Sequence, residues 1–232
     1  MKYHSIPRTC YPHAKIEEDC YDWWARHDLK VRQAQEKEYD IIFIGDSITH
    51  FWHSAEEAQR DQAHEVVWQE FYGCRNVLNL GYGYDRPQNV LWRLENGEFG
   101  QQKPKIVVLN IGTNCFSISR RYSGDSPEIA MEGVRAVAEK IFELSPQSKL
   151  LMMEIFPRLP QEIQQKIDKL NALIREFAAG DERITLLSLN NKLARDGVLI
   201  PEFYGDKTCH PNAAGYRIWA EELEPHIKAI LG

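Results

Sequence analysis

Four clusters of small and polar residues, far apart in the sequence, contain side chains suited to acyl transfer. The first holds a serine, Gly45-Asp46-Ser47, and the third holds an asparagine, Gly112-Thr113-Asn114. The second is Gly81-Tyr82-Gly83-Tyr84-Asp85, and the fourth, residues 206–212, contains His210. A serine hydroxyl is a weak nucleophile unless a base takes its proton, and histidine is the commonest base. The residue types therefore indicate nucleophilic catalysis if the fold brings the clusters together.

Each cluster also has an ordinary structural interpretation. Gly-Asp-Ser is a common turn in which Asp46 or Ser47 caps a helix. Asn114 is a typical turn residue, and a lone histidine such as His210 is often a surface or capping residue. Three of the clusters follow predicted strands, however, and the fourth precedes the last predicted helix. This joint placement favours a shared site.

Strand and helix patterns alternate from residue 41 onward. Short apolar runs, of which 41–44 is β-branched, predict five strands, at 41–44, 77–80, 106–111, 150–155 and 184–187. Helices are predicted from Asp85 or Arg86, from Ser126 with Ile129 facing inward, over 163–177, and over 212–231. This alternation predicts an α/β fold with a parallel sheet covered on both faces. Sites in such sheets form at the carboxyl ends of the strands.

Residues 1–38 are polar and charged, and we expect them to form an N-terminal helical extension packed on the domain. Its helix is predicted from Ile16 to Lys37, with Trp24 and Val31 facing inward. We find no internal repeat, low-complexity segment or linker. Residues 1–232 are therefore predicted to form a single domain.

Composition disfavours several classes of function. The net charge of −6 is not accompanied by a basic block, which argues against a nucleic-acid partner. The apolar runs are too short to span a bilayer. Because no apolar leader is visible, the sequence favours a cytoplasmic protein, with secretion or a periplasmic location as the alternative if a signal peptide was removed.

Cysteine usage argues against disulfides and metals. The five cysteines form an odd number and contain no CxxC pair. No set of His, Cys and Asp has the sequence spacing of metal ligands, so we predict no metal and no other cofactor. Cys115 and Cys209 stand next to candidate site residues, which raises the alternative of a metal or thiol role, but we interpret both as structural.

The clusters resemble the sequence blocks of the SGNH (GDSL-type) hydrolases. Residues 42–49 look like the first block, Asn79-Leu80-Gly81 the second, Gly112-Thr113-Asn114 the third and His210-Pro211-Asn212 the last. Residues 90–98 are similar to the catalytic subunits of intracellular platelet-activating-factor acetylhydrolase and their bacterial relatives. The resemblance covers roughly residues 40 to 230. It implies a flavodoxin-like three-layer α/β/α sandwich with a five-stranded parallel sheet, and hydrolysis of acyl esters without a metal.

The resemblance also implies roles for individual residues. Ser47 matches the nucleophile, and His210 matches the base that takes its proton and later protonates the leaving alcohol. The Asn114 side chain and the Ser47 N–H would donate to the oxyanion. The family usually has a further oxyanion glycine where this chain has Tyr84. The backbone N–H would then come from Tyr84, or from Gly83 if the loop shifts by one residue.

The third member of the triad is ambiguous. The family's acid usually lies three residues before the histidine, where this chain has Lys207, whereas Asp206 lies four before. A one-residue bulge would aim Asp206 at His210. Otherwise Asp206 is a surface turn residue, and a backbone carbonyl supports a Ser-His dyad.

Substrate contacts are expected from residues near the nucleophile. Aromatic side chains there either line an acyl pocket or belong to the core: Phe51, Trp52, Tyr82, Tyr84 and Phe116. Of these, we predict that Trp52, Tyr82 and Phe116 contact substrate. Asp46 is also predicted at the substrate, although it is expected mainly to tie its loop to backbone N–H groups.

The leading prediction is a serine esterase that removes short acyl groups, with acetyl as the expected group, from a small-molecule ester. A carbohydrate O-acetylesterase on the same fold would use the same catalytic residues, so lipid and sugar esters are not distinguished. The alternative from another class is a non-catalytic binding module with a degenerate site, motivated by Tyr84 and Lys207. The sequence also leaves open whether the protein forms a homodimer.

Overall fold

Five parallel strands form one sheet in the order β2-β1-β3-β4-β5. The computed structural model describes residues 6–53, 63–206 and 208–232. The strands are β1 (Ile41–Gly45), β2 (Val77–Gly81), β3 (Ile106–Asn110), β4 (Lys149–Met153) and β5 (Ile184–Leu187). This order, with β1 between β2 and β3, is the doubly wound order of flavodoxin-like proteins. The predicted fold class is confirmed.

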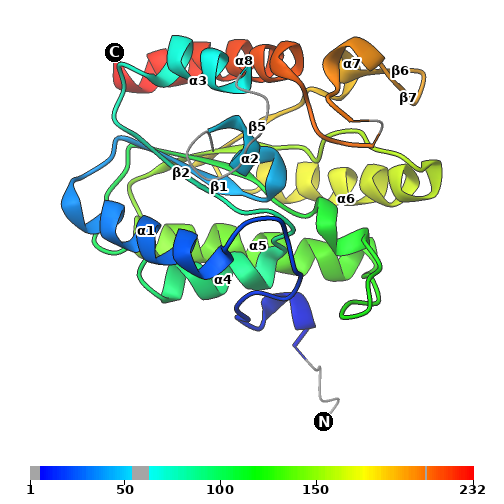
Figure 1. Cartoon of the computed structure of the whole chain (residues 1–232), viewed down its shortest axis with the longest axis horizontal. Coiled ribbons are helices and arrows are strands. Elements are labelled where there is room, and N and C mark those ends of the chain that lie inside the picture. The colour runs from blue at the N-terminus through cyan, green and yellow to red at the C-terminus, as the bar shows by residue number, and fades with distance from the viewer. Residues whose placement is uncertain (1–5, 54–62, 207) are drawn as a thin grey trace.

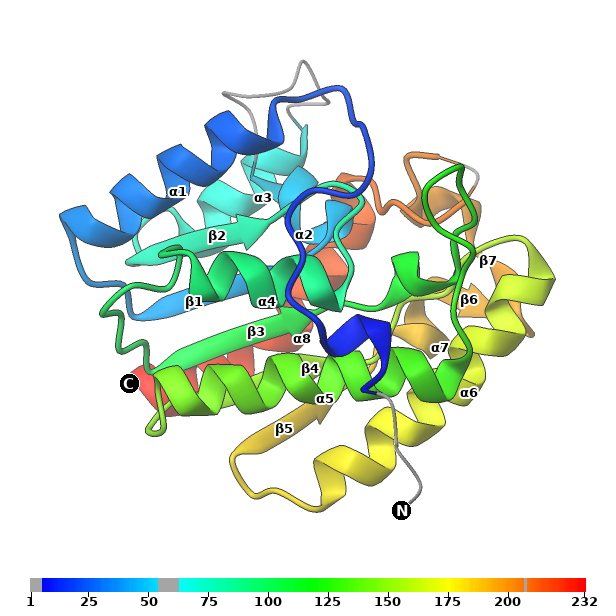
Figure 2. The same cartoon turned by 90° about the horizontal axis from the view of Figure 1, so that it is seen from below.

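Helices cover both faces of the sheet and give three layers (Figures 1 and 2). One face carries α4 (Pro87–Glu95), α5 (Pro127–Leu144) and α6 (Gln161–Ala179), and the other carries α3 (Ala63–Tyr72) and α8 (Ala213–Leu231). Successive side chains of a strand point to opposite faces. Ile42 and Ile44 therefore join the first apolar layer, whereas Ile41 and Phe43 join the second.

Polar caps set where the helices around the site begin. Asp46 caps α2 (Ser47–Trp52) by accepting a hydrogen bond from the Ile48 N–H, directly after β1. Asn212 caps α8 by accepting from the N–H groups of Ala214 and Gly215. The two caps hold Ser47 and His210 at the junctions between irregular chain and helix.

The N-terminal helix differs from the prediction. It spans Trp23–Glu36 (α1) instead of 16–37, because the Asp22 side chain caps it by accepting from the N–H groups of Trp24 and Ala25. The inward tryptophan is Trp23, which is 2% exposed, whereas Trp24 is 48% exposed and Val31 is half-buried. The inward face of α1 includes charged residues, so an apolar stripe could not reveal its register. On α5, Ile129 is likewise exposed, contrary to the prediction.

Several short elements were not predicted. They include α3 itself, α7 (Asn190–Leu193) and the antiparallel pair β6 (Ala194–Arg195) and β7 (Val198–Leu199). The described residues also include the 3₁₀ helices η1 (Arg8–Cys10), η2 (Thr113–Phe116) and η3 (Pro201–Phe203). Among the described residues, no helix is both long and apolar enough to cross a membrane.

Candidate active site

The four clusters meet at one pocket beyond the carboxyl ends of the central strands. The pocket has a volume of about 200 Å³. Ser47 follows β1, Tyr84 lies in the loop after β2, and Asn114 lies in η2 after β3. The fourth cluster reaches the same pocket through the loop before α8. Among the described residues, the pocket is lined by Asp19, Ser47, Phe51, Tyr84, Asn114, Ser117, Arg158, Thr208, Cys209 and His210.

Ser47 and His210 form the central contact of the site. The Ser47 Oγ lies 2.9 Å from the His210 Nε2. Ser47 is buried but lines the pocket, and it is the first residue of α2. Backbone N–H groups in the first turn of a helix have no partner within the helix and carry partial positive charge. The geometry can therefore support proton transfer from Ser47 and stabilise negative charge beside it.

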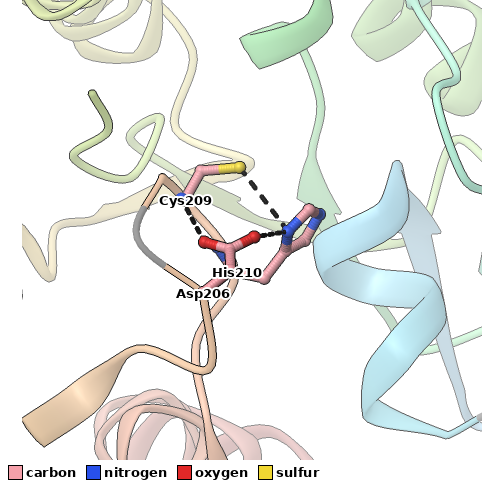
Figure 3. A group of neighbouring side chains, drawn as sticks. All are labelled: Asp206, Cys209 and His210. Atoms are coloured by element: carbon pink, nitrogen blue, oxygen red, sulfur yellow. Dashed lines mark hydrogen bonds and ion pairs between the residues drawn. The ribbon is translucent and has the colours of Figure 1, made fainter. Parts of the chain in front are cut away.

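The extra residue between Asp206 and His210 is absorbed by a tight turn. The Asp206 Oδ1 accepts hydrogen bonds from the N–H groups of Thr208 (2.8 Å), Cys209 (2.8 Å) and His210 (3.2 Å). This turn directs the other oxygen, Oδ2, toward the His210 Nδ1, with which it forms a hydrogen bond (Figure 3). The arrangement is the one that the bulge alternative requires. Lys207 lies outside the described residues.

Asp206 and His210 shift each other's pKa. Burial alone would lower the pKa of His210, but the hydrogen bonds and charge interactions with Asp206 and Cys209 together outweigh burial and raise the pKa. Burial alone would raise the pKa of Asp206, but the bond to His210 and those from the backbone N–H groups lower it. The pair thus favours a carboxylate beside an imidazolium, the charge state that forms once the base has taken a proton.

Of the four predicted oxyanion donors, the N–H groups of Ser47 and Tyr84 and the Asn114 side chain remain available among the described residues, whereas the Gly83 N–H does not. The Gly83 N–H is already bonded to the His50 Nδ1 (3.2 Å). We find no acceptor for the Tyr84 N–H within the described part of the chain. The Asn114 Nδ2 donates one hydrogen bond to the Asp85 carbonyl (3.1 Å), which leaves its second hydrogen for a ligand. Of the two loop alternatives, the geometry favours Tyr84 over Gly83.

The backbone of Tyr84 is strained at this position. Its φ of +60° lies in the left-handed region, which costs roughly 1–2 kcal/mol for a residue with a side chain. This is the conformation expected where the related family has glycine. Its neighbour Gly83 is required for another reason: a Cβ there would lie 1.9 Å from the Asp19 Oδ2.

A buried ionic cluster supports the loop that carries Tyr84. Asp85 accepts hydrogen bonds from the Trp23 Nε1 (2.9 Å) and the Arg93 Nε (2.8 Å). Arg93 also pairs with Glu98, and neither side chain is exposed. Burial raises the pKa of Asp85 to about 6, although Arg93 opposes this shift. The cluster joins α1 and α4 to the oxyanion loop.

The predicted aromatic contacts need correction. Trp52, Tyr82 and Phe116 are at most 2% exposed and do not line the pocket. Trp52 packs on Trp219 with ring centroids 4.6 Å apart, and the Tyr82 hydroxyl bonds to a buried carboxylate. The aromatic side chains that do line the pocket are Phe51 and Tyr84. Trp52, Tyr82 and Phe116 are instead buried by the packing of the elements around them, which the sequence alone does not show.

Asp46 does not line the pocket either. It is fully buried, and its Oδ1 accepts from the Ile48 N–H at 3.0 Å. Burial raises the pKa of Asp46 to about 7. These contacts fit the expected tie to backbone N–H groups, and they leave no direct contact with a ligand in the pocket.

Three polar residues of the pocket, Asp19, Ser117 and Arg158, were missed by sequence reasoning. Arg158 follows β4, and its Nη1 donates to the carbonyl (3.2 Å) and the hydroxyl (3.1 Å) of Thr113. Asp19 comes from the segment before α1. Examining the end of the fourth strand, as we did for the first three, would have found Arg158. No pattern in the sequence pointed to Asp19.

The fold brings together three possible metal ligands that the sequence spacing did not indicate. The sequence predicts no ligand set, yet ligand atoms of Asp206, Cys209 and His210 all lie within 4.8 Å of one another. Figure 3 shows the Cys209 sulfur and the Asp206 carboxylate approaching the same ring nitrogen. Turn geometry, not sequence spacing, creates this group. Cys115 is buried in the apolar layer, in keeping with its structural interpretation.

Comparisons with known proteins match most of the chain to one family. Residues 43–218 match the family described as GDSL-like Lipase/Acylhydrolase. The Rattus norvegicus platelet-activating factor acetylhydrolase IB subunit alpha2 is 32% identical over 224 residues, which cover 95% of this chain and 90% of that protein. The Pongo abelii subunit alpha1 is 33% identical over 167 residues, 71% of this chain, and the match spans only 65% of that subunit's length.

The fold has close counterparts among solved structures. A GDSL-like lipase from Bacteroides thetaiotaomicron superposes with a TM-score of 0.70 at 18% identity. The superposition covers 90% of this chain and 100% of that one. At this level of identity the likeness concerns the fold alone.

Proposed function

Because this chain belongs to the GDSL-like lipase/acylhydrolase family, we propose that it is a serine esterase that hydrolyses acyl esters of small molecules. The observation that carries the proposal is the 2.9 Å contact between the Ser47 Oγ and the His210 Nε2 inside a pocket. A nucleophile and base within hydrogen-bond reach, with the base held by a third group, are the usual signature of nucleophilic catalysis.

In the proposed reaction, the Ser47 Oγ attacks the ester carbonyl carbon while the His210 Nε2 takes its proton. Asp206 stabilises the imidazolium that forms. The tetrahedral oxyanion accepts hydrogen bonds from the N–H groups of Ser47 and Tyr84 and from the side chain of Asn114. His210 then protonates the leaving alcohol, and a water molecule releases the acyl group by the same steps.

The size of the pocket supports a short acyl group. Its volume of about 200 Å³ lies below the roughly 300–1,000 Å³ of ordinary ligand pockets. The relatives' names describe acetyl removal, which supports acetyl as the group. We therefore propose acetyl esters as the preferred substrates.

The polar lining supports a second candidate, a carbohydrate O-acetylesterase. Asp19, Ser117 and Arg158 give the pocket hydrogen-bonding groups. Such groups suit the hydroxyls of a sugar better than a purely apolar lipid chain. The catalytic steps would be unchanged, and only the alcohol part of the ester would differ.

A substrate panel tests the proposal. The purified protein is assayed on p-nitrophenyl esters of increasing acyl length, on acetylated sugars and on lysolipids, with Ser47→Ala as the control. We expect hydrolysis that falls as the acyl chain lengthens and that is lost in Ser47→Ala. A folded parent protein that binds ligands but hydrolyses none of these esters would instead support the binding module.

A further inference from the structure

The side chains that support the base also form a set of metal ligands. Asp206, Cys209 and His210 offer a carboxylate oxygen, a thiolate sulfur and an imidazole nitrogen, the three donor types that zinc uses in proteins. The Cys209 Sγ lies 3.8 Å from the His210 Nδ1. With bond lengths of about 2.3 Å to sulfur and 2.0 Å to nitrogen, a tetrahedral zinc ion holds such ligands about 3.5 Å apart. The Cys209 and His210 ligand atoms therefore lie close to the spacing that zinc requires, and the Asp206 Oδ2, which is hydrogen-bonded to the same Nδ1, would swing away from the ring to make room for the ion.

Two further features make the cluster a suitable site. The Asp206 carboxylate is held in place by three backbone N–H groups on Oδ1, which leaves Oδ2 directed at the ring. The side chains of His210 and Asp206 are 29% and 38% exposed, so an ion can enter from solvent and keep a water ligand. Cys209, by contrast, is nearly buried and supplies its sulfur from below the surface.

We propose that this cluster, Asp206-Cys209-His210, is an inhibitory site for zinc and other soft divalent cations. The inference rests on the proposed function, in which His210 is the base for Ser47. It gives Cys209 a role in regulation while catalysis itself remains independent of metal.

Binding would change the protons of the site in a defined way. The Cys209 thiol loses its proton to solvent and binds as a thiolate. The His210 Nδ1 must offer its lone pair to the ion, so the proton of the neutral ring is carried on Nε2 instead. The two negative ligands, Asp206 and Cys209, balance the double positive charge of zinc. The Nε2–H then donates to the Ser47 Oγ, and no base remains to take the serine proton.

The first test measures inhibition of ester hydrolysis. Zinc chloride is titrated into the parent protein, Cys209→Ser and Cys74→Ser, and each rate is compared with the same variant's rate in EDTA. Cys74 is an exposed cysteine and serves as the matched control. We expect reversible inhibition of the parent and of Cys74→Ser, and a half-inhibitory zinc concentration at least about tenfold higher in Cys209→Ser. Equal inhibition of Cys209→Ser would overturn the proposal.

The second test does not depend on activity. Cadmium ions are titrated into Ser47→Ala and into the double variant Ser47→Ala/Cys209→Ser, and ultraviolet absorption from thiolate-to-cadmium charge transfer is recorded. We expect a saturable band at one equivalent that is lost in the double variant, whose fold is checked by circular dichroism. An identical band in both variants contradicts the site. If the parent shows no hydrolysis, the proposed function fails while this titration still reports on the site.

Discussion

At the scale of single residues, the bond between Asp206 and His210 sets the strength of the base. Asp206→Asn keeps an oxygen for the backbone N–H groups of the turn but removes the charge that stabilises the imidazolium. We predict that kcat falls by about 10²- to 10⁴-fold with KM little changed. Steady-state kinetics on p-nitrophenyl acetate measure both constants. A near-parental kcat would mean that Asp206 only shapes the turn.

The site could be anticipated from sequence only where a strand end marked it. Ser47 and Asn114 follow apolar runs that end in glycine, so their place on the sheet edge was predictable. The direction in which the Asp206 carboxylate points was not predictable, because it depends on a turn in which one carboxylate oxygen accepts hydrogen bonds from three backbone N–H groups. Trp52 was placed wrongly since an aromatic residue after a strand suits a pocket wall and a core equally well.

At the scale of elements, the left-handed conformation of Tyr84 shapes the oxyanion loop. Tyr84→Gly and Tyr84→Ala both remove the ring, but only glycine relieves the strain of φ +60°. After allowing for glycine's greater freedom in the unfolded chain, we predict that Tyr84→Gly is more stable than Tyr84→Ala by about 0.5–1 kcal/mol. Urea denaturation of the two variants measures the difference. A less stable glycine variant would argue against strain at this position.

The buried cluster around Arg93 ties α1 and α4 to that loop. Arg93→Met would leave Asp85 and Glu98 buried without their cation, so we predict a loss of about 3–5 kcal/mol in the free energy of unfolding. Arg121→Met is the matched control, because the side chains of Arg121 and Glu18 are both largely exposed and such pairs contribute at most about 1 kcal/mol. Chemical denaturation compares the two. Equal losses in the free energy of unfolding would show that the buried cluster stabilises the fold no more than a surface ion pair does.

The sequence predicted strands better than the edges of helices. Each strand is a short, mostly apolar run, and burial on both faces makes such runs conspicuous. The start of α1 depends instead on one capping residue, Asp22, and its buried face contains His27 and Arg26, which hydrogen-bond to interior acceptors. Charged residues buried by specific partners do not stand out as an apolar stripe, so the register of α1 was wrong.

At the scale of the whole molecule, one sheet joins all the segments that carry the site. Because α1 packs beside β2 and bonds through Trp23 to Asp85, we propose that the N-terminal extension and the sheet fold as one domain. We predict a single cooperative unfolding transition, with coincident midpoints by tryptophan fluorescence and far-ultraviolet circular dichroism. Two separated transitions would contradict the single domain.

The central claim is that Ser47 is the nucleophile of an esterase, and covalent labelling tests it most directly. The protein is treated with a fluorophosphonate, which reacts with activated serines, and the digest is analysed by mass spectrometry while residual hydrolysis of p-nitrophenyl acetate is followed. The account predicts one adduct, on the peptide that contains Ser47, with hydrolysis lost in proportion to labelling and no adduct in Ser47→Ala. Labelling of another residue, or full hydrolysis after Ser47 is blocked, would contradict it.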